Sequence, residues 1–402
     1  MYKHYIKGVR RMYDRNKEYK YLSKEFLDKM DKVKVPFTEL GDFVRLRTYS
    51  RFDENLNRRE TWLETVARVC DYNVSLVKEA KPHYDEDKLR EEAEFMFKKM
   101  YMLETFSSGR TLWIGGTPVS KTNPLANFNC SFTTIECFED FKEIFLLSML
   151  GTGIGIRILK DDVLKLPAVN NNIKVLHKEY TPVPKKLRKE FTEITFEKNT
   201  AFLTIGDSKM GWAKSISLFF DLISDCVYNT IDTIVINYDN VRPKGEKLKN
   251  FGGRASGHTS MLRMFKKIAK VVNNTEGGKL KTIDVLDICN IIGENVVSGG
   301  VRRTAEIILF DVDDKDILNA KSNLYIQDEN GNWKSNEEIL HRRMSNNSVF
   351  FNSKPDRKTL HEIINSIRYS GEPGFINAEA ASKRRENFQG VNPCGKLKFC
   401  LM

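Results

Sequence analysis

A helix followed directly by a strand is encoded in residues 138–159, FEDFKEIFLLSMLGTGIGIRIL. Apolar residues recur at helical spacing up to Leu150, and a Gly-Thr-Gly-Ile-Gly run then leads into an apolar strand over 154–159. Glycines let backbone amides approach an anion, so the run resembles a phosphate-binding loop. Such loops follow a strand and precede a helix, however, which is the reverse of the order here. The stretch therefore predicts a helix packed closely on a strand rather than a dinucleotide fingerprint.

The same alternation continues along the chain. Helical periodicity is found at 85–104, 138–150, 212–228, 260–272 and 282–297, and apolar runs typical of strands lie at 154–159, 233–238, 305–310, 348–352 and 374–377. Strands separated by helices indicate parallel βα units, so we predict an α/β fold. The polar stretch 161–207 interrupts this rhythm and is interpreted as an insertion or small subdomain. An Asn-Gly turn within 328–335 predicts a hairpin.

Composition indicates a globular protein. The 402 residues include 65 Lys and Arg against 54 Asp and Glu, giving a net charge of +11, and 41% are hydrophobic. No apolar run approaches the roughly 20 residues that a bilayer span needs, and the N-terminus lacks a signal-peptide core. We expect a cytoplasmic protein without a membrane partner. Clusters of Lys and Arg fit either a solvated surface or attraction of polyphosphates, whereas the absence of interleaved aromatics argues against a nucleic-acid partner.

The seven cysteines are scattered and form no Cys-x-x-Cys pair. This pattern argues against a secreted disulfide scaffold and against a structural zinc site, so no metal site is predicted. Cys70, Cys226 and Cys289 are expected to be small core residues. Cys394 differs, because Asn-Pro-Cys-Gly favours a tight non-helical turn that would place its sulfur on a loop. On local grounds alone, an ordinary loop cysteine explains this residue equally well.

Seven segments in a fixed order carry a family resemblance. They are FNCSF (128–132), GTGIGIRI (151–158), VRPKGEKLKNFGGRASG (241–257), DICNIIGENVVSGGVRRTAEI (287–307), MSNNSVFF (344–351), SGEPGFIN (370–377) and NPCG (392–395). Together they resemble the adenosylcobalamin-dependent (class II) ribonucleotide reductases, and most of all the monomeric ribonucleoside-triphosphate reductases. The resemblance runs from about residue 38 to residue 395.

The resemblance implies a specific architecture. Its members fold as an α/β barrel made of two halves of parallel strands, with a finger loop threaded through the centre. This chain would supply the first half of that barrel within 105–402, after a mainly helical region over 1–104. An inserted effector-binding subdomain would lie at about 161–240, and the finger loop at about 390–396.

The resemblance also implies roles for individual residues in the radical reduction of ribonucleoside triphosphates at C2′. Cys394 corresponds to the cysteine whose thiyl radical takes the 3′-hydrogen of the ribose, and Cys130 to one of two thiols that reduce C2′. Asn392 corresponds to an asparagine that hydrogen-bonds in the site. The remaining correspondences are Thr117, Asn129 and Gly153 for substrate binding, and Arg242, Lys249 and Arg254 for a deoxynucleoside triphosphate effector.

The chain also departs from the family pattern. Lys396 stands where the family has a glutamate that accepts the proton of the 3′-hydroxyl, and an ammonium group cannot do so at its ordinary pKa. Cys400 is too close to Cys394 to be the second reducing thiol. The second half-barrel, the adenosylcobalamin-binding region and the cysteine pair that takes electrons from thioredoxin or a similar reductant have no counterpart in the sequence.

These departures leave two hypotheses open. In the first, the chain is the N-terminal portion of a reductase and is inactive alone. In the second, it is a non-catalytic nucleotide-binding fragment or subunit that a separate C-terminal polypeptide completes.

Overall fold

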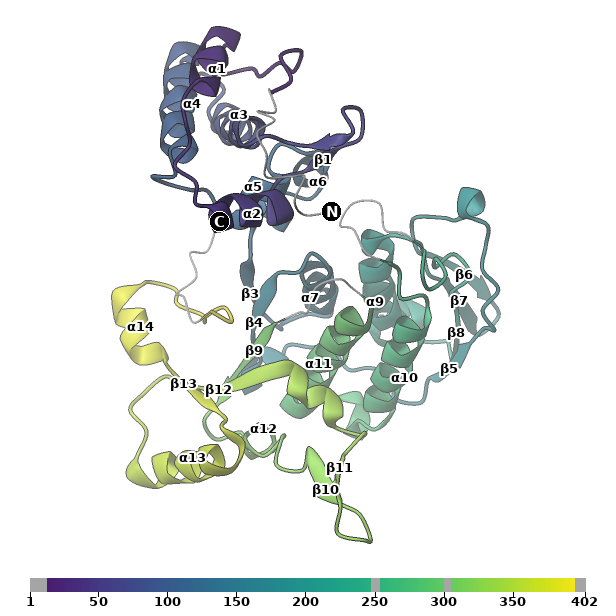
Figure 1. Ribbon diagram of the computed structural model, residues 1–402. Coiled ribbons are helices and arrows are strands. Elements are labelled where there is room, and N and C mark those ends of the chain that lie inside the picture. Colours follow the sequence, from purple (N-terminus) through teal and green to yellow (C-terminus); the bar gives the residue numbers. More distant parts are fainter. Residues whose placement is uncertain (1–12, 247–253, 300–304, 395–402) are drawn as a thin grey trace. The chain divides into compact units, whose positions relative to one another are not determined.

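The computed structural model describes residues 13–246, 254–299 and 305–394 (Figure 1). Its contacts divide the chain into two compact units, 1–129 and 130–402, and each is described here by itself. Lys249, Lys396 and Cys400 lie outside the described residues. Among the described residues, no helix combines the length and the apolar character needed to cross a membrane.

The first unit is mainly helical. Its helices are α1 (Lys24–Asp31), α2 (Glu39–Thr48), α3 (Trp62–Ala80), α4 (Glu86–Tyr101), α5 (Gly109–Ile114), α6 (Pro118–Thr122) and the 3-10 helix η2 (Pro124–Asn127), and β1 (Phe52–Asp53) pairs antiparallel with β2 (Arg58–Arg59). The apolar faces of α3 and α4 form most of its core, which includes Leu63, Val66 and Phe97. This helical unit extends past residue 104 because α5 packs on α3, where Arg68 donates hydrogen bonds to the carbonyl oxygens of Leu112 and Gly115.

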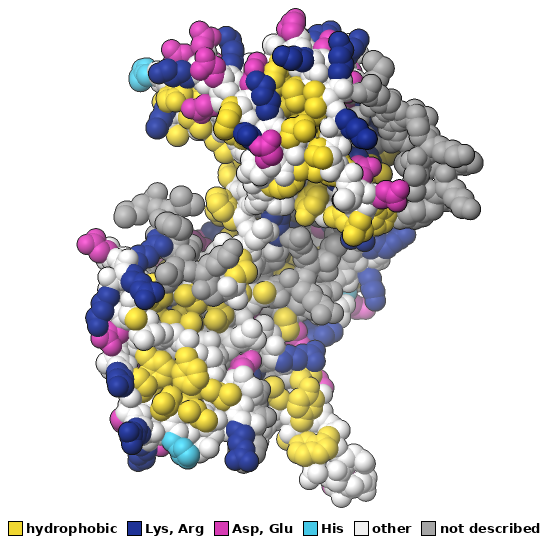
Figure 2. Space-filling view, turned by 60° about the vertical axis from the view of Figure 1, so that its left-hand side comes forward, with side chains coloured by type: hydrophobic (Ala, Val, Ile, Leu, Met, Phe, Trp, Pro, Cys, Tyr) yellow, Lys and Arg dark blue, Asp and Glu magenta, His cyan; other side chains and the backbone are white. Residues whose placement is uncertain are grey.

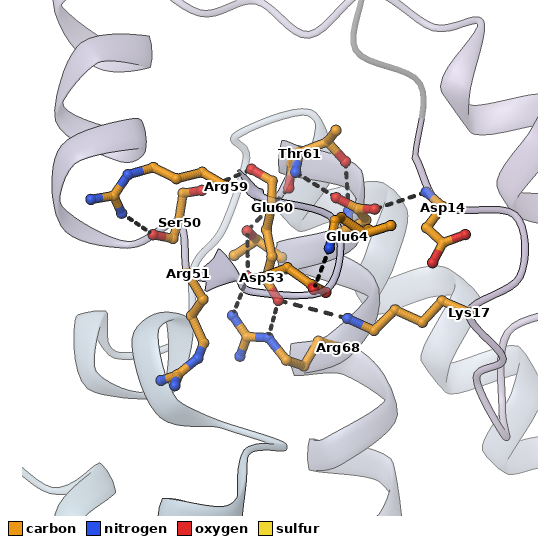
Figure 3. A network of polar contacts seen from close by, with 12 residues as sticks. Asp14, Lys17, Ser50, Arg51, Asp53, Arg59, Glu60, Thr61, Glu64 and Arg68 are labelled. Atoms are coloured by element: carbon orange, nitrogen blue, oxygen red, sulfur yellow. Dashed lines mark hydrogen bonds and ion pairs between the residues drawn. The ribbon is translucent and has the colours of Figure 1, made fainter. Parts of the chain in front are cut away.

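A buried ionic network holds the start of α3 (Figure 3). The Glu64 carboxylate accepts hydrogen bonds from both terminal nitrogens of Arg58, at 2.7 and 2.8 Å, and from the backbone N–H groups of Asp14 and Thr61. Burial alone would raise the pKa of Glu64, but these hydrogen bonds outweigh it and lower the pKa to about 2. The carboxylate therefore ties two distant segments to the helix in its ionised form.

We predict that Glu64→Gln destabilises the first unit at neutral pH by about 2–3 kcal/mol, because the depressed pKa is a measure of how strongly the fold prefers the carboxylate. In the parent chain this contribution is complete above the unfolded pKa of 4.5 and is lost as the pH falls toward 2. Urea unfolding between pH 3 and pH 7 should show a smaller pH dependence for the variant. An exposed control, Asp87→Asn, should show the same pH dependence of unfolding free energy as the parent chain. If Glu64→Gln lost as much stability between pH 7 and pH 3 as the parent chain does, the prediction would be wrong.

The second unit is built on a five-stranded parallel sheet with strand order β13-β12-β9-β4-β3 (Figure 1). The strands are β3 (Cys130–Thr134), β4 (Gly153–Arg157), β9 (Glu306–Asp311), β12 (Ser345–Phe351) and β13 (Gly374–Asn377). Alternate strand residues face opposite sides of a sheet. Ile154, Ile156 and Ile308 accordingly pack on one side, in the core shared with α7 (Glu139–Met149) and α11 (Thr282–Gly299). Ile307 and Leu309 face the other side.

A second sheet forms the insertion. Its order is β5-β8-β7-β6, with β5 (Lys174–His177), β6 (Glu193–Glu197), β7 (Thr200–Thr204) and β8 (Thr233–Asn237). Strands β6 and β7 are antiparallel, and the other two pairs are parallel. Helices α9 (Lys209–Ser224) and α10 (Thr259–Asn273) contribute Phe219 and Phe265 to the core that this sheet shares with the rest of the unit.

The remaining elements are short or peripheral. They are α8 (Lys160–Val163), α12 (Lys315–Leu318), α13 (Arg357–Ser370), α14 (Ala378–Arg384), the 3-10 turns η3 (Lys185–Leu187), η4 (Cys226–Tyr228), η5 (Glu276–Gly278) and η6 (Leu340–Met344), and the strands β10 (Tyr325–Gln327) and β11 (Trp333–Ser335). The predicted hairpin is confirmed, since β10 and β11 pair antiparallel around a turn in which Gly331 has a φ of 78°.

The sequence predicted most of the large elements correctly. The helices expected at 85–104, 138–150, 260–272 and 282–297 are α4, α7, α10 and α11, and the five expected strands correspond to β4, β8, β9, β12 and β13. The prediction for Cys226 was wrong. Helix α9 ends at Ser224, and Cys226 lies exposed in the turn that follows, whereas Cys70 and Cys289 are buried as expected.

The surface of the second unit mixes charges of both signs with apolar patches. Leu360, Ile364 and Phe375 remain exposed among its described residues, and Figure 2 shows how apolar side chains gather in patches on one face. Lys and Arg are interspersed there with Asp and Glu.

Candidate active site

The site lies where the end of the described chain crosses the first strands of the parallel sheet. Residues 386–394 form a finger that lies against β3 and β4. A Cβ atom on Gly155 would lie only 1.9 Å from the carbonyl oxygen of Val391, and one on Gly390 only 2.1 Å from Cε2 of Phe132. The Pro393 ring is 3.3 Å from the corresponding position on Gly153. Glycine is therefore required at Gly155 and Gly390 so that finger and sheet can touch.

This contact explains the Gly-Thr-Gly-Ile-Gly run. Gly153 and Gly155 face the finger, and Ile154 and Ile156 between and beyond them are fully buried on the helix side of the sheet. Gly151 serves a separate purpose, since its φ of 74° allows the tight turn after α7. The prediction that these glycines serve close packing of helix on strand was wrong, because Gly153 and Gly155 face away from α7 and pack against the finger. Their spacing of two residues follows from the alternation of side chains along a strand.

The finger brings two cysteines together. Cys130 is the first residue of β3 and is paired in register with Gly153 on β4. The Sγ atoms of Cys130 and Cys394 lie 3.3 Å apart, although the two residues are 264 positions apart in the sequence. Cys394 is exposed and Cys130 is partly exposed. Asn392, two residues before Cys394, is buried with 8% of its surface exposed. Cys130, Gly153, Asn392 and Cys394 thus form one constellation.

The other residues expected to bind substrate belong to the first unit. Thr117 is buried, and its hydroxyl donates a hydrogen bond to the carbonyl oxygen of Ile114 at 2.6 Å. Asn129 is exposed at the end of that unit. Their roles in substrate binding stay predictions.

The residues expected to bind an effector are only partly described. The Arg242 guanidinium is paired with Asp207, with Nε 2.9 Å from Oδ1, so its charge is already compensated within the insertion. Arg254 is exposed and donates a hydrogen bond to the carbonyl oxygen of Gly245 at 2.9 Å. Of the two described residues in this set, Arg254 is therefore the one that is exposed.

One buried acid was missed by the sequence analysis. Glu306, the first residue of β9, is 2% exposed, and neither carboxyl oxygen has a hydrogen-bond partner among the described residues. Glu306 is paired in register with Ile154 of β4, so its side chain faces the helices that cover the sheet. A Cβ atom on Gly293 of α11 would lie only 2.3 Å from its Oε1. Burial raises the pKa of Glu306 to about 8. The sequence does contain a signal for this buried acid, namely a carboxyl group at the start of the apolar run Glu-Ile-Ile-Leu-Phe.

We predict that Gly155→Ala displaces the finger, because the new methyl group would overlap the Val391 backbone. The expected cost is about 1–3 kcal/mol in unfolding free energy, together with faster alkylation of Cys130. Gly153→Ala is the matched control, since its nearest neighbour atom at 3.3 Å belongs to a proline ring rather than to backbone. Equal stability and equal alkylation rates in the two variants would show that the finger does not depend on this contact.

Within the described residues, no group of three or more His, Cys, Asp and Glu side chains is placed to hold a metal ion. The chemistry available at the constellation is that of two neighbouring thiols and one buried amide.

Comparisons with known proteins agree with this picture. Residues 22–117 match the family model described as ribonucleotide reductase alpha domain, and residues 177–272 match that described as B12-dependent ribonucleotide reductase, insertion domain. An adenosylcobalamin-dependent ribonucleoside-triphosphate reductase from Lactobacillus helveticus is 31% identical over 94% of this chain and 55% of its own length. The enzyme of that name from Lactobacillus leichmannii is 29% identical with the same coverage.

The solved structure of a B12-dependent (class II) ribonucleotide reductase superposes with a TM-score of 0.75 at 27% identity, covering 93% of this chain and 56% of that one. The chain thus spans about half the length of the curated relatives that it matches.

Proposed function

Because the chain belongs to the adenosylcobalamin-dependent (class II) ribonucleotide reductases, we propose that it carries the radical and reducing thiols for the conversion of ribonucleoside triphosphates to 2′-deoxyribonucleoside triphosphates. The observation that carries this proposal is the finger itself, which presents Cys394 beside Cys130 with their Sγ atoms 3.3 Å apart. Two thiols at one edge of a sheet can act on neighbouring carbons of a single ribose.

The roles that we propose for Cys394, Cys130 and Asn392 are those that the family resemblance implies, and the position of each residue is compatible with its role. Cys394 is exposed at the tip of the finger, so we assign to it the thiyl radical that takes the 3′-hydrogen of the substrate. Cys130 is held on a strand, and we assign to it one of the two thiols that reduce C2′ and end in a disulfide. Asn392 is buried in the finger, and burial restricts the orientation of its side-chain amide. We assign to this amide a hydrogen bond within the site.

Adenosylcobalamin, when bound, would supply the radical that initiates the reaction. The exposure of the Cys394 thiol fits this need, because a radical source must be able to reach that sulfur. No described residue is assigned to corrin binding. A dithiol reductant such as thioredoxin would restore the disulfide to two thiols after each turnover.

The test is an assay of deoxynucleotide formation with a ribonucleoside triphosphate, adenosylcobalamin and dithiothreitol. The 402-residue chain is assayed alone and with a polypeptide that supplies the C-terminal part of a curated relative. We expect turnover in the complemented sample when Lys396→Glu restores the glutamate of the family pattern, and little or none when Lys396 is kept. A complemented sample that binds ribonucleotides but never reduces them would instead favour the non-catalytic nucleotide-binding alternative.

We further propose that the insertion binds a deoxynucleoside triphosphate as an effector. Support comes from the match of residues 177–272 to the insertion-domain model and from the exposed charge of Arg254. One charge-assisted contact to a phosphate contributes about 1.5–3 kcal/mol, so Arg254→Ala should weaken binding by roughly 10- to 150-fold. Calorimetric titration with the four deoxynucleoside triphosphates measures this directly. Arg90→Ala, an exposed arginine of the first unit, is the control, and equal affinities in both variants would remove Arg254 from the site.

A further inference from the structure

The contact between Cys130 and Cys394 has a second chemical consequence. A disulfide bond is about 2.05 Å long, so two Sγ atoms at 3.3 Å need to approach by only a little more than 1 Å. One of the two thiols is on a regular strand, and the other is at the tip of the finger. From this juxtaposition we propose that Cys130 and Cys394 form a reversible disulfide under oxidising conditions, which fastens the finger to β3.

The surroundings favour this pair over other pairings. Val391 is buried beside Ile307 and Leu309, and its backbone is pressed against Gly155, which holds the finger on the sheet. Arg157 of β4 also donates a hydrogen bond to the carbonyl oxygen of Gln389. These contacts hold the finger on the sheet and keep Cys394 next to Cys130. The effective concentration of each thiol at the other is therefore high.

The other described cysteines are less suited to the reaction. Cys70 and Cys289 are buried, and burial raises the pKa of both thiols, which keeps them in the unreactive protonated form. Cys137 and Cys226 are exposed, but no structural contact joins either of them to Cys394.

The proposed oxidation balances with hydrogen peroxide as the oxidant. The exposed Cys394 sulfur attacks the peroxide, the O–O bond breaks, and one water leaves, which yields a sulfenic acid. The Cys130 thiol then displaces the sulfenic oxygen as a second water and forms the S–S bond. Two thiols and one peroxide thus give one disulfide and two waters, and a dithiol such as dithiothreitol reverses the reaction by exchange.

This inference rests on the proposed function for its biological meaning. The disulfide would engage the sulfur that we assign to the thiyl radical, and also one of the sulfurs assigned to C2′ reduction. An oxidised enzyme would therefore be unable to abstract hydrogen until a dithiol restores both groups. The bond differs from the one formed in turnover, in which Cys130 pairs with the second reducing thiol and Cys394 stays free.

The test is peptide mapping of the folded chain after treatment with equimolar hydrogen peroxide. Cys130 and Cys137 share the tryptic peptide 122–142, and Cys400 lies close to Cys394 in sequence, so the experiment uses the background Cys137→Ser, Cys226→Ser, Cys400→Ser as well as the parent chain. We expect peptides 122–142 and 386–396 to appear linked, with a mass two hydrogens below their sum, and to separate on addition of dithiothreitol.

Two controls connect the link to the fold. Gly155→Ala, which pushes the finger from the sheet, should lower the yield of the linked peptide at least about tenfold, because disulfide formation tolerates little displacement of the sulfur atoms. Peroxide treatment in urea should give mixed pairings that include Cys70 and Cys289.

The outcomes separate this inference from the proposed function. Absence of the linked peptide in a folded sample whose Cys130 and Cys394 both remain alkylatable would overturn the disulfide, whatever the activity. A link in the parent chain between Cys394 and Cys400, with none to Cys130 in the background variant, would overturn it as well. A correct link in a chain that never reduces ribonucleotides when complemented would leave the disulfide established and remove the proposed function.

Discussion

Cys394→Ser is expected to abolish release of the substrate's 3′-hydrogen, with a loss of at least about 10⁴-fold in a preparation that turns over ribonucleoside triphosphates. A serine hydroxyl keeps nearly the same shape, but its O–H bond is too strong to form the radical that takes hydrogen from carbon. The measurement uses substrate labelled with tritium at C3′ and follows the label that appears in water. If the 402 residues are inactive by themselves, the C-terminal part of a curated relative is added to each sample.

Cys130→Ser is the matched variant, because its sulfur lies 3.3 Å from that of Cys394 and is removed by the same change. We assign Cys130 to reduction at C2′ and not to hydrogen abstraction. Loss of label from C3′ should therefore still be detectable, while deoxynucleotide formation fails. If both variants lose 3′-exchange to the same extent, the division of roles between the two thiols is wrong.

Glu306→Gln is expected to stabilise the second unit by about 3 kcal/mol at pH 7, which is a large effect for a single substitution. The native carboxyl group is buried, no residue in the described ranges hydrogen-bonds to it, and burial raises its pKa from 4.5 to about 8. The folded state therefore favours the neutral acid, whereas the unfolded chain releases the proton at a lower pH. Stability is complete below pH 4.5 and is lost as the pH rises toward 8. A glutamine cannot ionise, so it avoids this loss.

Urea unfolding at pH 5, 7 and 8.5 measures the effect. The difference between Glu306→Gln and the parent chain should be small at pH 5 and should grow with pH. Glu276→Gln is the control, since Glu276 has an exposed side chain paired with Lys281 and its replacement should change stability by less than about 0.5 kcal/mol. If Glu306→Gln raised the unfolding free energy equally at all three pH values, the pKa of Glu306 would not differ between the folded and unfolded states, and the prediction would be wrong.

The sequence by itself determined the class of fold and the family. Helices and strands such as α11 and β9 are long and regular enough for their periodicity to be recognised locally, and their alternation indicates a parallel sheet. The ordered motifs identified the reductase family and singled out Cys394 and Cys130. The strand β3 was missed because Cys-Ser-Phe-Thr-Thr is short and half polar. Cys226 was misplaced because helical periodicity continued past the true end of α9.

Only the tertiary structure decided how these pieces meet. The contact between Cys130 and Cys394 depends on the strand order β9-β4-β3 and on the finger returning across it, and no local pattern encodes a contact between residues 264 positions apart. The same applies to Gly155, whose need for glycine arises from the Val391 backbone, and to Glu306, whose burial without a partner among the described residues depends on the helix packed against it. Secondary structure follows from the spacing of neighbouring residues, whereas proximity, burial and charge compensation follow from which segments the fold brings together.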